Sequence, residues 1–319
     1  MCYSAMVEQN LKSIGLRFKA RIQTDFFEEI FRRRIRDDSI RIPKALEANF
    51  DDPKTPEERR IQGYLEEYRA RRTSQLEAEL FRQKKRRADA ERTLKDKETK
   101  KALEDLRIAG NKIDWHMRKL AELSRTAPEP MDSRIFPFWY APVLVQEAGE
   151  TVIRPMRYHC RANGKPESID RRYPGLYNAR RDNLEGYWKD LFGHRHAVLL
   201  VSSFFENVAR NDFEHRTMRP GEKPENLVLH FDPDPPIEMA IACLWDRWRS
   251  PGKPDLYSFA AITDEPPPEV AATGHNRCVI PLKETHLRAW LTPESRSREE
   301  LYGILDDRER PYYRHERAA

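Results

Sequence analysis

A stretch of 71 residues, 57–127, contains no proline, although the chain has 23 prolines in 319 residues. Residues 51–107, which overlap it, hold 17 Lys+Arg and 14 Asp+Glu, so more than half of these side chains carry charge. Apolar residues recur at roughly helical spacing from Ile61 to Leu120, but the stripe is thin and is interrupted around Lys84–Asp89. The pattern predicts a long, solvated helical hairpin or a short coiled coil.

The start of this helix is marked by Thr55 as a capping residue, Pro56 at the first helical position and Glu57 and Glu58 in the first turn. We expect helical structure from Asp25 to about Ala127, and we treat 25–127 as a charged helical insertion. Two further roles of this segment stay open: self-association or a protein partner, and a DNA-binding arm. The arm would use the basic residues Arg82, Lys84, Lys85, Arg86 and Arg87.

The sequence changes after Pro128, where short β-rich runs are separated by Pro, Gly, Asp and Asn. This pattern predicts an α+β fold with an antiparallel sheet or barrel core and flanking helices. Leu282–Leu291 is predicted to be helical, and the last 15 or so residues are polar and expected to be loosely held. The predicted strands are Ala141–Gln146, Thr151–Ile153, His196–Val201, Leu227–Phe231, Ile237–Leu244, Tyr257–Ile262 and Asn276–Ile280.

Composition excludes several classes of protein. The longest apolar runs are far shorter than the ~20 residues that span a bilayer, and no signal peptide is expected. Four cysteines without a CxxC pair do not form a disulfide framework, so a reducing, cytoplasmic location is expected. No metal or cofactor is expected, because His159, His194 and His196 lack a recognisable ligand spacing. The net charge of +5 permits binding to nucleic acid without requiring it.

Cys2 is the residue with the most distinctive chemistry. If Met1 is removed, Cys2 carries both an α-amine, with an ordinary pKa of about 7.7–8.0, and a thiol, with a pKa of about 8.5. An aldehyde reacts with such a 1,2-aminothiol to give a Schiff base, and the thiol then closes a five-membered thiazolidine ring. The ring closure is intramolecular and therefore strongly favoured. Taken alone, however, Cys2 is also consistent with an incidental cysteine near a chain end that has no catalytic role.

Several sequence blocks carry a resemblance to a known family. The chain begins Met1-Cys2-Tyr3-Ser4, and Tyr177-Asn178-Ala179-Arg180, His196–Glu206 and Gly274–Ile280 follow in order. Met156-Arg157-Tyr158 and Ala242–Trp248 are weaker matches. Together these blocks resemble the SOS response-associated peptidase (SRAP) family, the abasic-site processing proteins, over about 1–22 and 130–292.

The resemblance implies an enzyme of the DNA damage (SOS) response that removes its own Met1 and crosslinks to abasic sites in single-stranded DNA. The crosslink would be a thiazolidine at Cys2, and the enzyme would be both an autopeptidase (hydrolase) and lyase-like. It implies Glu206 as the acid/base group, His275 as a proton shuttle and Asn178 as the residue that holds the reacting terminus. It also implies that DNA phosphates are bound by Arg180, Arg277, Arg181 and Arg157.

These assignments are chemically reasonable. Imine formation needs proton transfers that a buried carboxyl group with a raised pKa can perform, and Glu206 follows the apolar Phe204-Phe205. A histidine titrates near neutral pH, and an arginine can donate two hydrogen bonds to one phosphate. The chain departs from the family pattern at Tyr3 and Ser4, where the family has Gly-Arg. It also departs at Asn207, where the family has Trp.

We therefore expect a discontinuous SRAP-like domain, 1–24 and 128–300, a helical insertion, 25–127, and a polar C-terminal segment, 301–319. The expected partner is single-stranded DNA with abasic sites, which would bring the cytoplasmic protein to the nucleoid. Two other functions remain open: a cysteine-type N-terminal-nucleophile peptidase that acts on peptides, and a non-catalytic scaffold that binds through the helical insertion.

Overall fold

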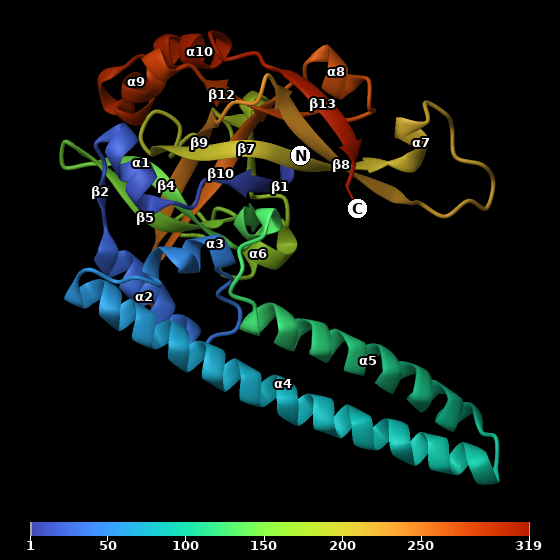
Figure 1. Ribbon diagram of the computed structural model, residues 1–319. Helices are drawn as coiled ribbons and strands as arrows, with labels where there is room; N and C mark the ends of the chain where they lie inside the picture. The colour runs from blue at the N-terminus through green and yellow to red at the C-terminus, as the bar shows by residue number, and fades with distance from the viewer. Residues whose placement is uncertain (1, 319) are drawn as a thin grey trace.

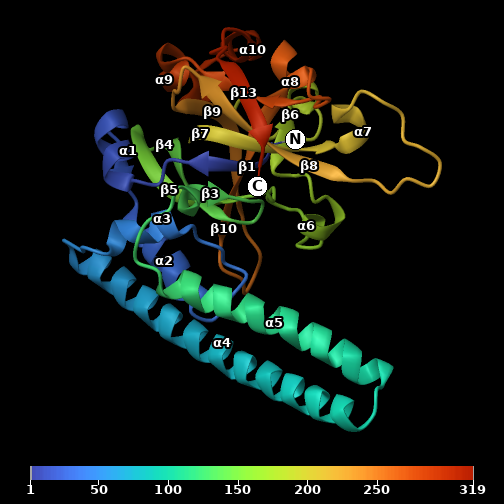
Figure 2. The same cartoon turned by 45° about the vertical axis from the view of Figure 1, so that its right-hand side comes forward.

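The computed structural model describes residues 2–318, and the side chains of 3–318. It has an α+β architecture in which helices flank a mixed sheet and a long helical hairpin projects from one side (Figures 1 and 2). The strands are β1 (Cys2–Val7), β2 (Arg21–Ile22), β3 (Arg134–Ile135), β4 (Tyr140–Glu147), β5 (Glu150–Tyr158), β6 (Asn178–Arg180), β7 (His196–Ala209), β8 (Asn226–Asp234), β9 (Met239–Trp248), β10 (Leu256–Asp264), β11 (Cys278–Val279), β12 (Pro281–Leu282) and β13 (Tyr312–Arg317). The helices are α1 (Leu11–Phe18), α2 (Thr24–Arg34), α3 (Lys44–Glu47), α4 (Pro56–Asp96), α5 (Lys100–Ser124), α6 (Ile169–Arg172), α7 (Arg210–Phe213), α8 (Pro268–Ala271), α9 (Leu287–Leu291) and α10 (Arg298–Asp306).

Strand β7 organises the sheet because its two halves pair with different neighbours. Its first half pairs with β4 and β9, and its second half pairs with β1 and β8. The pairings β9–β10–β5–β4–β7–β9 follow one another into a ring, although the β4–β7 and β5–β10 contacts are short. Most pairs are antiparallel, and β10 pairs in parallel with β5 and β6.

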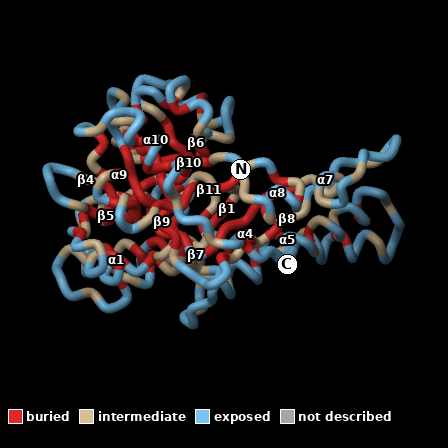
Figure 3. The backbone as a smooth tube through the Cα atoms, turned by 90° about the horizontal axis from the view of Figure 1, so that it is seen from above, coloured by how far each residue is buried: buried red, intermediate tan, exposed pale blue. Residues whose placement is uncertain are grey.

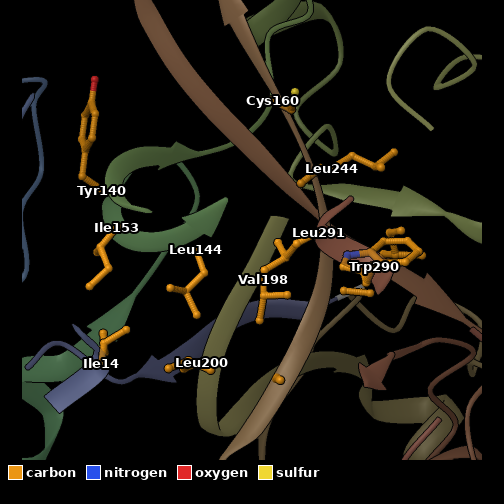
Figure 4. Close-up of a cluster of buried hydrophobic side chains, with 14 of the residues drawn as sticks. Ile14, Tyr140, Leu144, Ile153, Cys160, Val198, Leu200, Leu244, Trp290 and Leu291 are labelled. Carbon is orange, nitrogen blue, oxygen red and sulfur yellow. The ribbon is translucent and has the colours of Figure 1, made fainter. Parts of the chain in front are cut away.

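Two apolar cores lie on the two faces of this sheet, because successive side chains of a strand point to opposite faces. The inner core is formed almost entirely by strand residues such as Val143, Leu199 and Phe259. The outer core packs the other face against α1, α2, α9 and α10. Figure 3 shows the buried residues concentrated in the body, and Figure 4 shows part of the outer core, including Ile14 of α1 and Leu291 of α9.

The predicted helical hairpin is confirmed. Helix α4 begins with the expected cap, in which the Thr55 side chain accepts a hydrogen bond from the Glu58 N–H and the Glu58 carboxylate accepts one from the Thr55 N–H. The helix continues through Lys84–Asp89 without a break. Its first part belongs to the body, since Ile61 and Leu65 lie in the outer core together with residues of α2. The division into domains stays a prediction.

The predicted strands are found, most of them longer than expected, but two predictions at the C-terminal end need correction. Leu282–Leu291 is helical only over α9 and a preceding 3-10 turn, Glu284–His286. The segment expected to be loosely held instead forms α10 and then β13, which pairs with β8 along six residues. The side chain of Tyr313 in β13 is buried in the inner core, whereas the other side chains of the strand are exposed. Backbone pairing with β8 and the buried Tyr313 side chain therefore hold β13 in place.

Candidate functional site

Glu206 lies in the second half of β7 and is fully buried, like the two residues before it, Phe204 and Phe205. Its backbone is opposite Cys2 of β1 on one side and Leu229 of β8 on the other. Burial disfavours a charged carboxylate and raises the pKa of Glu206 to about 8. The group is therefore mainly protonated at neutral pH.

His275 is brought to Glu206 by a turn that only glycine fits. Gly274 has a φ of +84°, and a Cβ atom there would lie 2.7 Å from the backbone carbon of Asp212. The next residue, His275, places Nε2 3.5 Å from Oε2 of Glu206. Its ring is largely buried, and this burial lowers the pKa of His275 to about 4, so the imidazole is neutral at pH 7.

The hydrogen bonding of His275 fixes its tautomer. Nδ1 lies 2.7 Å from the carbonyl oxygen of Arg277, which can only accept, so Nδ1 carries the proton. Nε2 then presents a lone pair toward the protonated carboxyl group of Glu206. Both groups are uncharged in the resting state, and transfer of the carboxyl proton to Nε2 would convert them into a carboxylate–imidazolium pair.

Asn178 begins β6, at the edge of β10, and is 5% exposed. Within the part of the chain that the structure describes, neither its Nδ2 nor its Oδ1 has a hydrogen-bond partner. A buried amide without partners costs about 1–3 kcal/mol, so this donor and acceptor are suited to a group that arrives from elsewhere. The predicted contact with the reacting terminus stays a prediction.

The cysteines fall into two groups. Cys160, Cys243 and Cys278 are buried and unpaired, and burial raises the pKa of each thiol. These three are therefore inert at neutral pH. Cys2 differs because its backbone begins the first strand, directly opposite Glu206; its side chain and Met1 lie outside the described residues.

Two of the predicted DNA-binding arginines are brought together on one carboxylate. Arg180 donates from Nε to Oδ1 of Asp182 at 3.0 Å, and Arg277 donates from Nη2 to Oδ2 of the same residue at 3.2 Å. Asp182 is about half exposed. The Arg180 side chain is 52% exposed and could exchange this carboxylate for another anion, whereas the Arg277 side chain is only 14% exposed.

The other two predicted arginines are engaged in ion pairs. Arg181 contacts Asp264 and Asp306, and Arg157 contacts Asp170 at 2.8 Å with a side chain that is only 11% exposed. The structure places both within the network that holds loops to the sheet. Binding of DNA by these two arginines stays a prediction. The Arg157 side chain is less exposed than that of Arg180.

Sequence reasoning missed Arg134. This residue of β3 donates from Nε and Nη2 to the Ser4 hydroxyl at 3.0 and 2.8 Å, and its guanidinium lies 3.4 Å from the ring centre of Phe205. The contact places a positive charge beside the first strand, where the sequence showed only Ser4. No local signal could have revealed it, because the two residues are 130 positions apart.

Among residues 2–318, no group of three or more His, Cys, Asp or Glu side chains is arranged to hold a metal ion. Across the same described residues, no helix combines the length and the apolar character that a membrane span requires.

The structure thus combines a ring-shaped sheet with a buried carboxyl–imidazole pair beside the first strand. The sequence model of the family described as SOS response associated peptidase (SRAP) matches residues 93–316, and the chain belongs to this family. The matched range contains Asn178, Glu206 and His275, whereas Cys2 lies outside it. No curated protein matches the chain.

Three solved structures are similar to parts of it. A Bordetella bronchiseptica protein is 15% identical, covers 61% of this chain and 90% of its own, and has a TM-score of 0.45. A Bacteroides thetaiotaomicron protein is 14% identical, with 54% and 71% covered and a TM-score of 0.44. A phage-related protein from Bordetella bronchiseptica is 16% identical, with 58% and 80% covered and a TM-score of 0.42.

Proposed function

We propose that this protein captures abasic sites in single-stranded DNA by forming a thiazolidine between Cys2 and the aldehyde of the lesion. The observation that carries the proposal is the register of β1 on β7, which sets the backbone of Cys2 opposite Glu206, together with His275 at 3.5 Å from that carboxyl group. An acid–base pair therefore lies where the amine and thiol of residue 2 would react.

The chemistry follows from these groups. The Cys2 amine adds to the aldehyde carbon, and the resulting carbinolamine loses water after the protonated Glu206 donates a proton to the departing hydroxyl. The Cys2 thiol then adds to the imine carbon, and its proton returns to the carboxylate or to His275 Nε2. One C–N and one C–S bond form, one water leaves, and no oxidant is needed.

Reaction at the amine requires that residue 1 be absent, and we propose that the same site removes Met1. Hydrolysis of the Met1–Cys2 peptide bond needs a nucleophile and a group that protonates the departing amine. The Cys2 thiol would attack the Met1 carbonyl carbon while Glu206 protonates the departing Cys2 amine, and water would then hydrolyse the Met1 thioester to release methionine and the free thiol. Asn178, whose buried amide has no hydrogen-bond partner among the described residues, would orient the reacting residue.

DNA would be held by groups around this site. Arg180 and Arg277 would exchange Asp182 for a phosphate, whose geometry matches the planar guanidinium fork. Arg134 would supply the positive charge that Ser4 lacks, because it already lies on the Ser4 hydroxyl. An abasic sugar in a single strand presents its aldehyde with little unstacking penalty.

The test uses purified protein whose loss of Met1 has been verified by intact mass. It is mixed with a single-stranded oligonucleotide that carries one abasic site and, separately, with the undamaged strand, and both are run on a denaturing gel. The proposal predicts a heat-stable shifted band with the lesion alone, with a mass equal to protein plus DNA minus one water. Absence of that band from fully processed protein would overturn the proposal.

A further inference from the structure

The far end of the helical hairpin carries the excess positive charge of the whole chain. We define the hairpin tip as residues 82–101, which span the end of α4 and the start of α5. These 20 residues contain ten Lys+Arg and four Asp+Glu, whereas the rest of the chain contains 48 and 49. The protein outside the tip is therefore close to neutral, and the tip has a local excess of six positive charges.

The basic residues of the tip are of two kinds. Its arginines are engaged in ion pairs along the hairpin: Arg82 with Glu79, Arg86 with Asp105, Arg87 with Glu91 and Arg92 with Asp89. Its six lysines are exposed, and none has an ion pair with any described residue. These lysines are Lys84, Lys85, Lys95, Lys97, Lys100 and Lys101.

Among the acidic residues of the tip, Asp96 and Glu98 also lack an ion pair within the described chain, yet they are outnumbered by the lysines around them. The base of the hairpin is different, because Arg60 and Arg69 of α4 pair with Glu28 and Glu47 of the body. Ion pairs therefore connect the base of the hairpin to the body, while the lysines of the tip form no ion pair with any described residue.

The tip projects beyond the body on the side that also carries α7, the helix that follows the Glu206 end of β7 (Figures 1 and 3). Leu65 is the last α4 residue in the outer core. At 1.5 Å per residue, Lys84 lies about 30 Å beyond it along the helix and Lys97 about 50 Å. At 3.4 Å per base pair, this distance corresponds to roughly 8–14 base pairs of duplex.

The chemistry of the tip selects its partner. Residues 82–114 contain no Phe, Tyr or Trp, and the nearest exposed rings in sequence, Phe81 and Trp115, lie outside the tip, so the lysines of the tip have no interleaved rings on which unstacked bases would stack. Exposed lysines that have no ion pair with a described residue are suited to a regular array of phosphates, which bind them as point charges and release counterions. A second copy of the tip is disfavoured, because like charges would face each other.

We propose that the hairpin tip binds the phosphate backbone of duplex DNA that flanks the captured single-stranded site. The link to a flanking site rests on the proposed function, whereas the affinity of the tip for duplex DNA does not. The hairpin thus acts as an arm whose tip engages DNA about 30–50 Å along α4 from Leu65, the last α4 residue in the outer core. Most of the binding free energy comes from the lysines of the tip, and less from its arginines, which are already in ion pairs.

The test compares two full-length variants with equal loss of charge. The tip variant is Lys84→Gln/Lys97→Gln/Lys101→Gln, and the control is Lys12→Gln/Lys19→Gln/Lys189→Gln, three exposed lysines elsewhere that also have no ion pair in the described chain. Binding to an undamaged 30-base-pair duplex is measured between 50 and 200 mM salt. Crosslinking to a 12-nucleotide single strand with one abasic site is measured in parallel.

Each phosphate contact contributes about 0.9 to the slope of log affinity against log salt, so we expect the magnitude of this slope to fall by up to about three in the tip variant. We also expect this variant to bind the duplex several-fold more weakly. The control should lose less than a third as much, and both variants should crosslink the short strand as the parent does. Equal losses in the two variants, or no loss in the tip variant, would overturn the proposal. Failure of the parent to crosslink would count against the proposed function alone, because duplex binding is measured without a lesion.

Discussion

Glu206 and Glu91 are the same amino acid in two opposite surroundings. Glu206 is fully buried in β7, and burial raises the pKa of its carboxyl group to about 8. Glu91 is exposed on α4 and pairs with Arg87 one turn away at 2.8 Å. Water solvates the second group, whereas its exclusion from the first favours the protonated form of the carboxyl group. Burial in the sheet and exposure on the hairpin therefore give the same side chain opposite electrostatic surroundings.

The largest expected effect separates these two glutamates. Glu206→Gln keeps the shape of the side chain but removes its titrating proton, so in protein whose loss of Met1 has been verified by intact mass we expect the rate of crosslinking to an abasic strand to fall by about 10²–10⁴-fold. Glu91→Gln, the control, should leave this rate unchanged. Quench-flow sampling on denaturing gels measures both, and equal rates for Glu206→Gln and the parent would break the comparison.

The second effect concerns packing. Phe204→Ala removes a fully buried ring of the inner core that stacks on Phe231, and we expect the free energy of unfolding to fall by about 3–5 kcal/mol. Phe81→Ala removes a ring that is 72% exposed on α4, and its effect should stay within about 0.5 kcal/mol. Urea unfolding measures the difference, and a large loss for Phe81→Ala would show that the hairpin is packed in a way the structure does not show.

The third effect is a dependence of stability on pH. Between pH 4.5, the ordinary pKa of a glutamate, and about 8, the unfolded chain releases a proton that the folded chain retains at Glu206. The free energy of unfolding should therefore decrease as pH rises through this window, by at most about 1.4 kcal/mol per pH unit. Unfolding of Glu206→Gln at several pH values should lack this decrease. A parallel pH dependence in the two proteins would mean that the carboxyl group of Glu206 is ionised when folded.

His275 contributes in the opposite direction. Its pKa is lowered from 6.5 to about 4, so the unfolded chain takes up a proton in this range before the folded chain does, and stability should decrease as pH falls through it. His275→Gln should remove this decrease, which thermal unfolding between pH 4 and 6.5 would reveal as a smaller change in Tm.

The smallest effect lies on the hairpin. Arg86→Gln breaks the ion pair between Arg86 and Asp105, which links α4 to α5 with both side chains about a third exposed or less. We expect the free energy of unfolding to change by less than about 1 kcal/mol, and less at high salt. A loss of several kcal/mol at this pair would contradict the view that exposed charges stabilise the hairpin only weakly.

Local sequence signals predicted much of the structure. The cap at Thr55 and Glu58, the absence of proline and the alternation of β-rich runs each act over a few residues, and the structure confirms the hairpin and the sheet. The resemblance also selected Glu206 and His275, which lie 3.5 Å apart although they are 69 positions apart in sequence. Their spatial contact could not be derived from spacing alone.

The features that were missed depend on contacts between distant segments. Arg134 contacts Ser4 through the pairing of β3 with β1, and Arg157 is held by Asp170, so neither environment follows from the neighbouring residues. The polar strand β13 has a single buried side chain, Tyr313, and its pairing with β8 is made by backbone groups that carry no sequence pattern.

The most direct test of the central claim asks whether the thiol of Cys2 makes the crosslink permanent. Processed parent protein and processed Cys2→Ala are mixed with an abasic single strand, with and without borohydride, and denatured. The account predicts a stable adduct of the parent without borohydride, whereas Cys2→Ala, which keeps an α-amine but has no thiol, should give an adduct only when the Schiff base is reduced. A stable adduct of Cys2→Ala without borohydride would contradict a thiazolidine at Cys2.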